Sequence, residues 1–419
     1  MNCKYIFNKK YNIFANRITQ KTIKHIIKIM DINKNNFRLP AETLQRAVTP
    51  TYYYDMELLQ ETINELKRQT SGLPFVVHYA IKANGNPRIL KKIAENGIGA
   101  DLVSGGEIQA AVEAGFAPSS MNYSGVGKTD AEIQLGLSKG INCFNVESLP
   151  ELEVINSLAG SAGKKAGIAI RVNPDIDAQT HKYITTGTAD NKFGIAISEL
   201  ESVVRLATSL PNIQLKGLHF HIGSQITSMQ PYIMLCETVN KLLDNFESKG
   251  IRFEFVNVGG GLGIDYQNPE DHLIPDFKQY FDVFKQHLRL RSGQQLHFEL
   301  GRAIVGQCGS LISRVVFVKE NRGKKFMILD AGMNDLMRPA LYNAQHKIQN
   351  LTTKETATAT YDVVGPVCES SDVFARGYSM PLTRRGDIIA IRSAGAYGES
   401  MSSQYNMRPL PRSVFIAHK

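Results

Sequence analysis

Short apolar segments rich in β-branched residues recur along the chain between Pro74 and Arg302, and the stretches between them carry apolar residues at helical spacing. Near-continuous hydrophobic strands, each followed by a helix, are typical of parallel sheets covered by helices. Eight such units predict an α/β fold, a (β/α)8 barrel of the TIM type. An open, doubly wound sheet remains an alternative because the segment at 121–125 is weak. The predicted strands span residues 74–82, 97–104, 121–125, 141–148, 166–173, 214–223, 252–260 and 295–302.

The pattern changes after Arg302. Residues 313–319 and 325–331 alternate between apolar and polar positions around a short turn, which predicts a β-hairpin. Further strand patterns follow without long helices, so we expect a mostly-β domain, a β-barrel or sandwich, after the barrel. The predicted division is a basic N-terminal extension at 1–36, a strand joining the β-domain at 37–51, the barrel at 52–302 and the C-terminal β-domain at 303–419.

The positive charge of the chain is concentrated at its N-terminus. The total formal charge is +9, and residues 1–36 contain eight Lys or Arg residues and one acid, which amounts to +7. The rest of the chain therefore carries +2, which gives no reason to expect a nucleic acid partner. We expect residues 1–36 to be a dispensable extension, with an alternative start at Met30 or a targeting role as the other interpretations.

Composition indicates a soluble globular protein. Hydrophobic residues make up 43% of the sequence, and no apolar run approaches the roughly 18 residues that a membrane span requires. The five cysteines are widely spaced and form no CxxC pair. This usage predicts a reduced, cytoplasmic protein with no disulfide framework, no structural zinc and no membrane partner.

In such a barrel the functional side chains gather at the carboxyl ends of the strands. Lys82 closes the first predicted strand. A lysine there is usually the solvated end of the strand, but burial at the barrel mouth would lower its pKa and suit it to Schiff-base formation. His219 and His221 lie on one face of the sixth strand. A metal pair is the weaker interpretation because no acidic cluster with ligand spacing accompanies them.

The last two predicted strands end in further candidates. Residues 259–263 read GGGLG, a loop that either makes a plain turn or brings backbone N–H groups to a phosphate, and it does not match GxGxxG. Glu299 ends the eighth strand. A carboxylate beside a phosphate loop suits a protonated pyridine nitrogen, and a lysine opposite suits an aldehyde. Taken together, Lys82, the histidines, the glycine loop and Glu299 predict a site for pyridoxal 5'-phosphate.

Ten motifs, in their order along the chain, resemble the fold type III pyridoxal phosphate decarboxylases. The resemblance extends from about residue 40 to the C-terminus, and it implies an alanine racemase-like barrel with a β-domain. That architecture agrees with the one expected from the pattern. The motifs are HYAIKAN, ADLVSGGE, RVNPDIDAQTHKYITTG, NKFGI, GLHFHIGSQ, NVGGGLGI, FELGR, DAGMNDLMRPALY, GPVCESSD and GAYG.

The resemblance implies roles for the matching residues. Lys82 would bind the cofactor covalently and Cys368 would donate a proton. His221 would stack on the pyridine ring, Glu299 would pair with its nitrogen, and many relatives carry proline where this chain has Leu300, so the turn after Glu299 is expected to be looser. The implied cofactor contacts are Lys82, His221, Ser224, Gly259, Gly260, Gly261, Glu299, Leu300, Gly301, Arg302 and Tyr397. The implied substrate contacts are Arg302, Arg338, Tyr342, Glu369 and Tyr397.

The resemblance implies decarboxylation of a small amino acid. The HIGSQ sequence and the pair Arg338 and Tyr342, which would bind a distal carboxylate, favour meso-2,6-diaminoheptanedioate as substrate, with L-lysine and CO2 as products. Decarboxylases of ornithine, arginine or carboxynorspermidine share the fold and remain the alternative. An inactive binding protein is disfavoured because Lys82 and Cys368 are both present. In this family Cys368 and Glu369 come from the neighbouring subunit, so a homodimer with shared active sites is expected.

Overall fold

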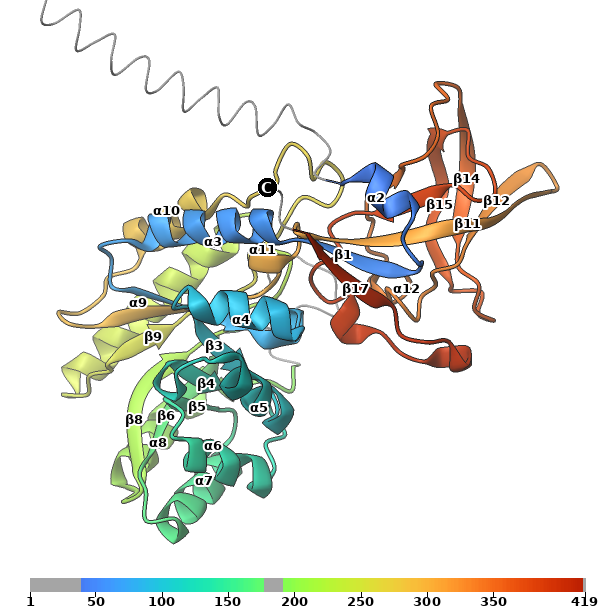
Figure 1. The fold of residues 1–419 in the computed structure, drawn as a ribbon. Coiled ribbons are helices and arrows are strands. Elements are labelled where there is room, and N and C mark those ends of the chain that lie inside the picture. The colour runs from blue at the N-terminus through green and yellow to red at the C-terminus, as the bar shows by residue number, and fades with distance from the viewer. Residues whose placement is uncertain (1–38, 177–190, 417–419) are drawn as a thin grey trace, which may run out of the picture.

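The computed structural model describes residues 39–176 and 191–416, and its first large unit is a closed barrel of eight parallel strands (Figure 1). The strand order is β5-β4-β3-β2-β10-β9-β8-β6, and pairing of β5 with β6 closes the barrel. The predicted barrel is thereby confirmed and the open sheet is excluded. The strands are β2 (Phe75–Ala80), β3 (Gly99–Leu102), β4 (Met121–Tyr123), β5 (Cys143–Val146), β6 (Ala166–Asn173), β8 (Ile213–His219), β9 (Phe255–Asn257) and β10 (Gln295–Leu300), with the short β7 (Ile195–Ala196) beside β6.

Helices alternate with these strands and surround the barrel (Figure 1). Capping residues fix where several of them begin and end. Ser104 accepts a hydrogen bond from the Glu107 backbone at the start of α5, and Gly115 ends that helix in the left-handed conformation. The helices are α3 (Met56–Thr70), α4 (Pro87–Glu95), α5 (Gly105–Ala114), α6 (Asp130–Lys139), α7 (Leu149–Ser161), α8 (Ile197–Ser209), α9 (Gln230–Ser248) and α10 (Phe277–His287).

The second unit is built mostly from strands (Figure 1). Its sheet has the order β13-β16-β11-β12-β14-β15, and β1 and β17 extend it from β11. The expected hairpin is the antiparallel pair of β11 and β12, joined through Arg322 and Gly323, both with positive φ. The strands are β1 (Thr51–Asp55), β11 (Gly309–Asn321), β12 (Lys324–Leu329), β13 (Ile348–Asn350), β14 (Thr358–Val364), β15 (Val373–Pro381), β16 (Ile388–Ile391) and β17 (Arg412–Ile416).

The strand that was expected at 37–51 lies further along the chain. Residues 41–45 form a short helix, α2 (Ala41–Gln45), and the strand is β1, so the expected boundary at residue 52 falls inside it. β1 pairs with β11 on one side and β17 on the other. Tyr52 and Tyr54 pack in the main core while Tyr53 packs in a smaller one on the opposite face. Because both faces are buried, the strand shows no alternation that would have marked its limits.

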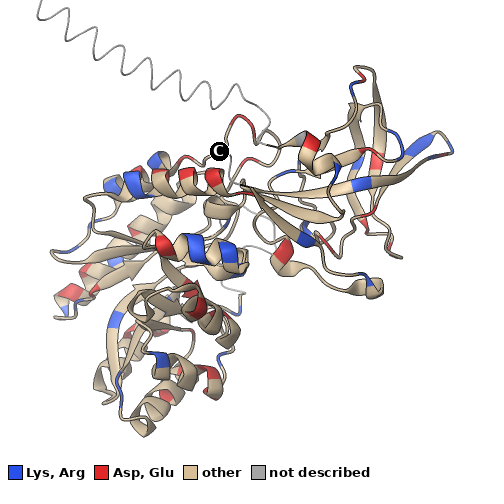
Figure 2. Cartoon of the chain, in the orientation of Figure 1, with Lys and Arg blue, Asp and Glu red and all other residues tan. Residues whose placement is uncertain are grey.

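The basic segment 1–36 lies outside the described residues. Across the described part, basic and acidic residues are interspersed over the helices of the barrel and the strands of the β-domain (Figure 2). None of the described helices combines the length and the apolar character needed to span a bilayer. The described cysteines are all free, with Cys143, Cys236 and Cys308 buried and Cys368 exposed.

Candidate active site

A cavity of about 360 Å³ lies at the carboxyl ends of the barrel strands, and residues of the β-domain complete its wall. This volume is within the range of small-molecule sites. Most of the residues predicted from the sequence meet here although they are far apart along the chain. They are Lys82, His221, Ser224, Gly261, Glu299, Leu300, Gly301, Arg302, Arg338, Tyr342 and Tyr397. Gly259, Gly260, Cys368 and Glu369 are not among the described residues that line the cavity.

Lys82 lies in a 3-10 turn, Ile81–Ala83, directly after β2. Its Nζ donates a hydrogen bond to Asp101 Oδ2 at 2.9 Å, and Asp101 in turn accepts one from Ser124 Oγ at 2.7 Å. Burial by itself would lower the pKa of Lys82, but the combined negative charges of Asp101, Tyr397 and Glu299 outweigh it, and the pKa is raised. The expected lowering of this pKa was therefore wrong. The physical reason is the negative charge around the amine, above all that of Asp101 on the neighbouring strand β3.

Glu299 lies on β10, facing the barrel interior, and only 6% of it is exposed. Its Oε1 accepts hydrogen bonds from Asn257 Nδ2 at 2.7 Å and Asn145 Nδ2 at 3.2 Å, and its Oε2 accepts one from His219 Nε2 at 3.0 Å. Burial opposes ionisation, but His219 and Lys82 outweigh it and lower the pKa of Glu299. The barrel interior thus holds a fixed carboxylate that stays ionised.

The two histidines of β8 and the following loop have separate partners. His219 binds Glu299, whereas His221 Nδ1 accepts the backbone N–H of Gly260 at 3.2 Å. Burial, followed by the positive charges of Arg171 and Lys82, lowers the pKa of His221 to about 3. His221 is therefore a neutral ring at physiological pH. No described His, Cys, Asp or Glu residues gather with them in a group of three that could hold a metal ion.

The glycines after β9 are not equivalent. The N–H of Gly259 donates to Asn257 Oδ1 at 2.9 Å and that of Gly260 to His221, so both are used within the chain. A Cβ on Gly260 would lie 1.9 Å from the carbonyl oxygen of Glu299, which explains why only glycine fits there. Gly261 is the glycine of this run that lines the cavity.

Two buried arginines share the cavity wall. Arg302 begins α11 (Arg302–Val305) and is 4% exposed, and Arg338 begins α12 (Arg338–Tyr342) and is 3% exposed. Arg302 Nη2 donates to Ser224 Oγ at 3.0 Å. No carboxylate of the described residues pairs with either guanidinium, and both Nε atoms are buried without a hydrogen-bond partner among those residues. A buried charge without a partner costs free energy, so two buried guanidinium groups favour the binding of anions in this cavity.

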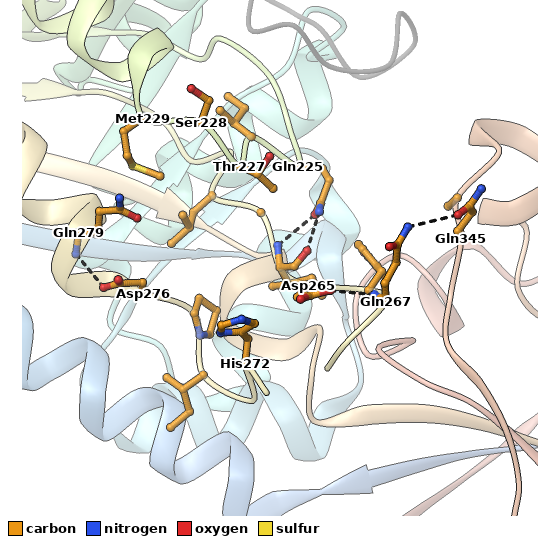
Figure 3. Close-up of a pocket in the computed structure, with 18 of the residues that line it drawn as sticks. Gln225, Thr227, Ser228, Met229, Asp265, Gln267, His272, Asp276, Gln279 and Gln345 are labelled. Carbon is orange, nitrogen blue, oxygen red and sulfur yellow. Dashed lines mark hydrogen bonds between the residues drawn. The ribbon is translucent and has the colours of Figure 1, made fainter. Parts of the chain in front are cut away.

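A larger cavity of about 900 Å³ adjoins this one and shares Leu262, Arg338 and Tyr342 with it. Figure 3 shows how its polar residues tie the surrounding loops together. Gln225 donates to the Ile264 carbonyl at 2.7 Å and accepts the Ile264 N–H at 3.2 Å. The loop after β9 is therefore fastened to the loop after β8.

Cys368 and Glu369 lie in the loop between β14 and β15. Cys368 is exposed, and its backbone N–H donates to Asn406 Oδ1 at 3.0 Å. The Glu369 carboxylate accepts a hydrogen bond from Tyr405 Oη at 2.5 Å. Both residues thus lie in the β-domain, and neither lines the Lys82 cavity of the same chain.

Three polar residues around Lys82 and Glu299 were missed in the sequence. Asp101, Asn145 and Asn257 each stand inside an apolar strand segment and are fully buried. A polar residue within such a segment must find a partner when it is buried, and this signal could have identified them.

Comparisons with known proteins agree with this geometry. The family model described as "Pyridoxal-dependent decarboxylase, pyridoxal binding domain" matches residues 57–306. The chain is 55% identical over 374 residues to the diaminopimelate decarboxylase of Bacteroides thetaiotaomicron, covering 89% of this chain and 97% of the relative. It is 44% identical to the enzyme of that name from Vibrio cholerae, covering 88% and 87%.

A solved structure shares the fold over nearly the whole chain. Diaminopimelate decarboxylase from Helicobacter pylori, complexed with L-lysine, superimposes with a TM-score of 0.85 at 41% sequence identity, covering 90% of this chain and 94% of that one. Sequence identities of 41% to 55% over most of both chains are sufficient to assign the family. The chain therefore belongs to the diaminopimelate decarboxylase family of pyridoxal-dependent decarboxylases.

Proposed function

We propose that this chain decarboxylates meso-2,6-diaminoheptanedioate to L-lysine and CO2 with pyridoxal 5'-phosphate as cofactor. The observation that carries the proposal is the pair of buried arginines, Arg302 and Arg338, that share one cavity without carboxylate partners. Two anions are needed to balance them, and a cofactor phosphate and a second substrate carboxylate are two such groups. The Helicobacter pylori structure holds L-lysine, the product that this reaction would give.

The residues of the cavity fit the cofactor. Lys82 offers an amine for its aldehyde, and Glu299 offers an ionised carboxylate for its pyridine nitrogen. The orphaned Nε of Arg302, with Ser224 and Gly261, offers donors for its phosphate, and Tyr397 completes this end of the wall. When bound, pyridoxal phosphate supplies the electron sink that accepts the electron pair left by the departing carboxylate.

The chain's own groups hold the charges that this chemistry needs. The three donors around Glu299 keep its carboxylate ionised, so it can hold a proton on the pyridine nitrogen. Asp101 fixes Lys82 Nζ at 2.9 Å and keeps the amine at the barrel mouth. The neutral His221 ring can cover the cofactor face without adding a positive charge.

Substrate recognition rests on Arg338 and Tyr342 for the distal carboxylate. Burial lowers the pKa of Arg338 to about 10, which leaves it cationic at neutral pH. Ornithine and arginine have no second α-carboxylate to pair with this cation, so a buried Arg338 disfavours the alternative substrates. Glu369 would bind the distal ammonium, and the Cys368 thiol would return a proton to the carbon that has lost CO2.

The position of Cys368 supports a homodimer with shared active sites. The thiol is outside the Lys82 cavity of its own chain, so the proton donor would come from a second copy. A further cavity of about 700 Å³ opens onto Lys82 and Tyr397 and offers room for that loop. We also propose a cytoplasmic location, which the free described cysteines support.

The substrate assignment is tested by measuring CO2 release. We expect the purified protein with pyridoxal phosphate to release CO2 from meso-diaminoheptanedioate and not from ornithine, lysine or arginine, because only the first presents a carboxylate to Arg338. Comparable turnover of ornithine would refute the assignment.

The shared active site is tested by complementation. Chains carrying Lys82→Ala or Cys368→Ala alone are expected to be nearly inactive. After subunit exchange, half of the dimers would contain one chain of each kind, and such a dimer has one intact site. The mixture should therefore recover up to about one quarter of wild-type activity. An inactive mixture whose hybrid dimers are verified by mass would contradict sharing, and each variant mixed with itself is the control.

A further inference from the structure

Tyr266 stands at the centre of a row in which three tyrosines alternate with two arginines. The Arg302 guanidinium lies 4.9 Å from the ring centre of Tyr397 and 5.8 Å from that of Tyr266. The Arg338 guanidinium lies 5.0 Å from the ring centre of Tyr266 and 5.8 Å from that of Tyr342. Of these three tyrosines, Tyr266 is the one whose ring lies beside both cations.

The surroundings of Tyr266 hold its ring in place. Its hydroxyl accepts a hydrogen bond from Arg302 Nη1, and its ring meets that of His346 edge to face at 4.7 Å. Its backbone carbonyl accepts the N–H of Lys347 at 3.0 Å. Only 8% of the residue is exposed. These contacts come from separate parts of the chain, so the ring has one well-defined position.

The loop that carries Tyr266 is fastened on both sides. Gln225 holds Ile264, two residues before Tyr266, through two hydrogen bonds, and Asp265 Oδ1 accepts the backbone N–H of Gln267 at 2.8 Å. Gln267 also donates to Gln345 Oε1 at 3.3 Å (Figure 3). The ring therefore sits on a rigid support at the wall of the larger cavity, next to the two arginines that line the smaller one.

An aromatic face is a suitable neighbour for a cation that must remain free to bind an anion. It stabilises a buried guanidinium through its quadrupole, whereas a carboxylate would neutralise the cation and compete with the ligand. Both arginines lack a carboxylate partner among the described residues, so the tyrosine faces are the compensation that the fold provides.

We propose that Tyr266 is a positioning residue that fixes Arg302 and Arg338 at a set separation, so that the cofactor phosphate and the distal carboxylate of the substrate bind in register. Tyr266 acts through the two arginines and touches no reacting atom. The inference rests on the proposed function for the contact between Tyr266 and Arg338, whereas the contact between Tyr266 and Arg302 is tested through cofactor binding.

Two substitutions separate the hydroxyl from the ring. Tyr266→Phe keeps the ring and removes the hydrogen bond to Arg302, so we expect the dissociation constant of the cofactor to rise about 3- to 10-fold, with KM for the substrate raised less than by Tyr266→Leu. Tyr266→Leu removes the ring from both cations. We expect it to raise KM about 5- to 30-fold at saturating cofactor, with kcat changed less. Cofactor binding is measured by equilibrium dialysis of the dimeric protein, and KM from CO2 release.

If Tyr266 only filled space in the core, its replacement would lower stability without a specific effect on KM or cofactor binding. Tyr361→Leu, at a buried tyrosine of β14, is the matched control, and it should lower the unfolding temperature without changing KM or cofactor binding. The proposal is overturned if Tyr266→Leu leaves KM unchanged when saturated with cofactor, or if Tyr266→Phe and Tyr266→Leu change both constants equally. The dialysis measurement needs no substrate. If the wild type did not decarboxylate the substrate, the proposed function would be refuted. Dialysis of the cofactor would still test whether Tyr266 positions Arg302.

Discussion

Replacing Lys82 with alanine is expected to remove the covalent attachment of pyridoxal phosphate and to lower kcat on the order of 10³-fold or more, the scale on which loss of a reacting group acts. The visible absorbance band of the bound cofactor should vanish or shift to that of the free aldehyde. The fold should persist, because Lys82 ends in the cavity and 38% of its side chain is exposed. Its removal leaves Asp101 without a cation, so a modest loss of stability is expected.

Lys91→Ala is the matched control for this change. Lys91 is an exposed lysine on α4, close in sequence to Lys82 and outside the cavity. Both variants are compared by absorbance spectrum, CO2 release and unfolding temperature. A cofactor band that survives in Lys82→Ala would contradict the cofactor site and, with it, the mechanism.

Replacing Arg338 with alanine is expected to raise KM for meso-diaminoheptanedioate about 30-fold or more, since truncating one partner of a buried charge pair costs about 2 to 5 kcal/mol. The cofactor band should remain, because Arg302, Ser224 and Lys82 are unchanged. Arg338→Lys keeps the charge and loses the planar fork, so an intermediate KM is expected. Steady-state kinetics at saturating cofactor provide the measurement.

The control for Arg338 is Arg205→Ala, at an exposed arginine of α8 that pairs with Glu201. It should leave KM and kcat unchanged. If Arg338→Ala raised KM no more than this control, the distal carboxylate would have to bind elsewhere. The assignment of the substrate class would then lose the observation on which it rests.

The barrel was predictable because its strands are nearly continuous hydrophobic segments and because the apolar residues of its helices recur about every 3.6 residues. Each of these signals is local. The boundary at β1 was not predictable in this way. Its side chains Tyr52, Tyr53 and Tyr54 are buried on both faces of the sheet, and the strands that pair with it lie more than 250 residues away. Sequence pattern defines a strand best when one face meets water.

The site, like the fold, has features that local sequence predicts and features that depend on distant parts of the chain. The ends of barrel strands meet by construction of the fold, so Lys82, Glu299 and Arg302 could be grouped from the sequence alone. The raised pKa of Lys82 could not be predicted from the sequence, because the direction of its shift depends on Asp101, a neighbour on another strand. Tyr266 was missed for the same reason: its partners Arg302 and Arg338 are brought to it by the tertiary structure.

The exposed position of Cys368 has a consequence for how much of this protein a cell must make. If the active sites are shared as proposed, a single folded chain would carry the cavity and the cofactor but no proton donor beside it. Catalysis would then follow the fraction of chains in dimers, which falls by mass action on dilution. Below the dimer dissociation constant, specific activity would decline in proportion to protein concentration while the fold stayed intact. The abundance of the chain would thus set the flux through the reaction more steeply than linearly.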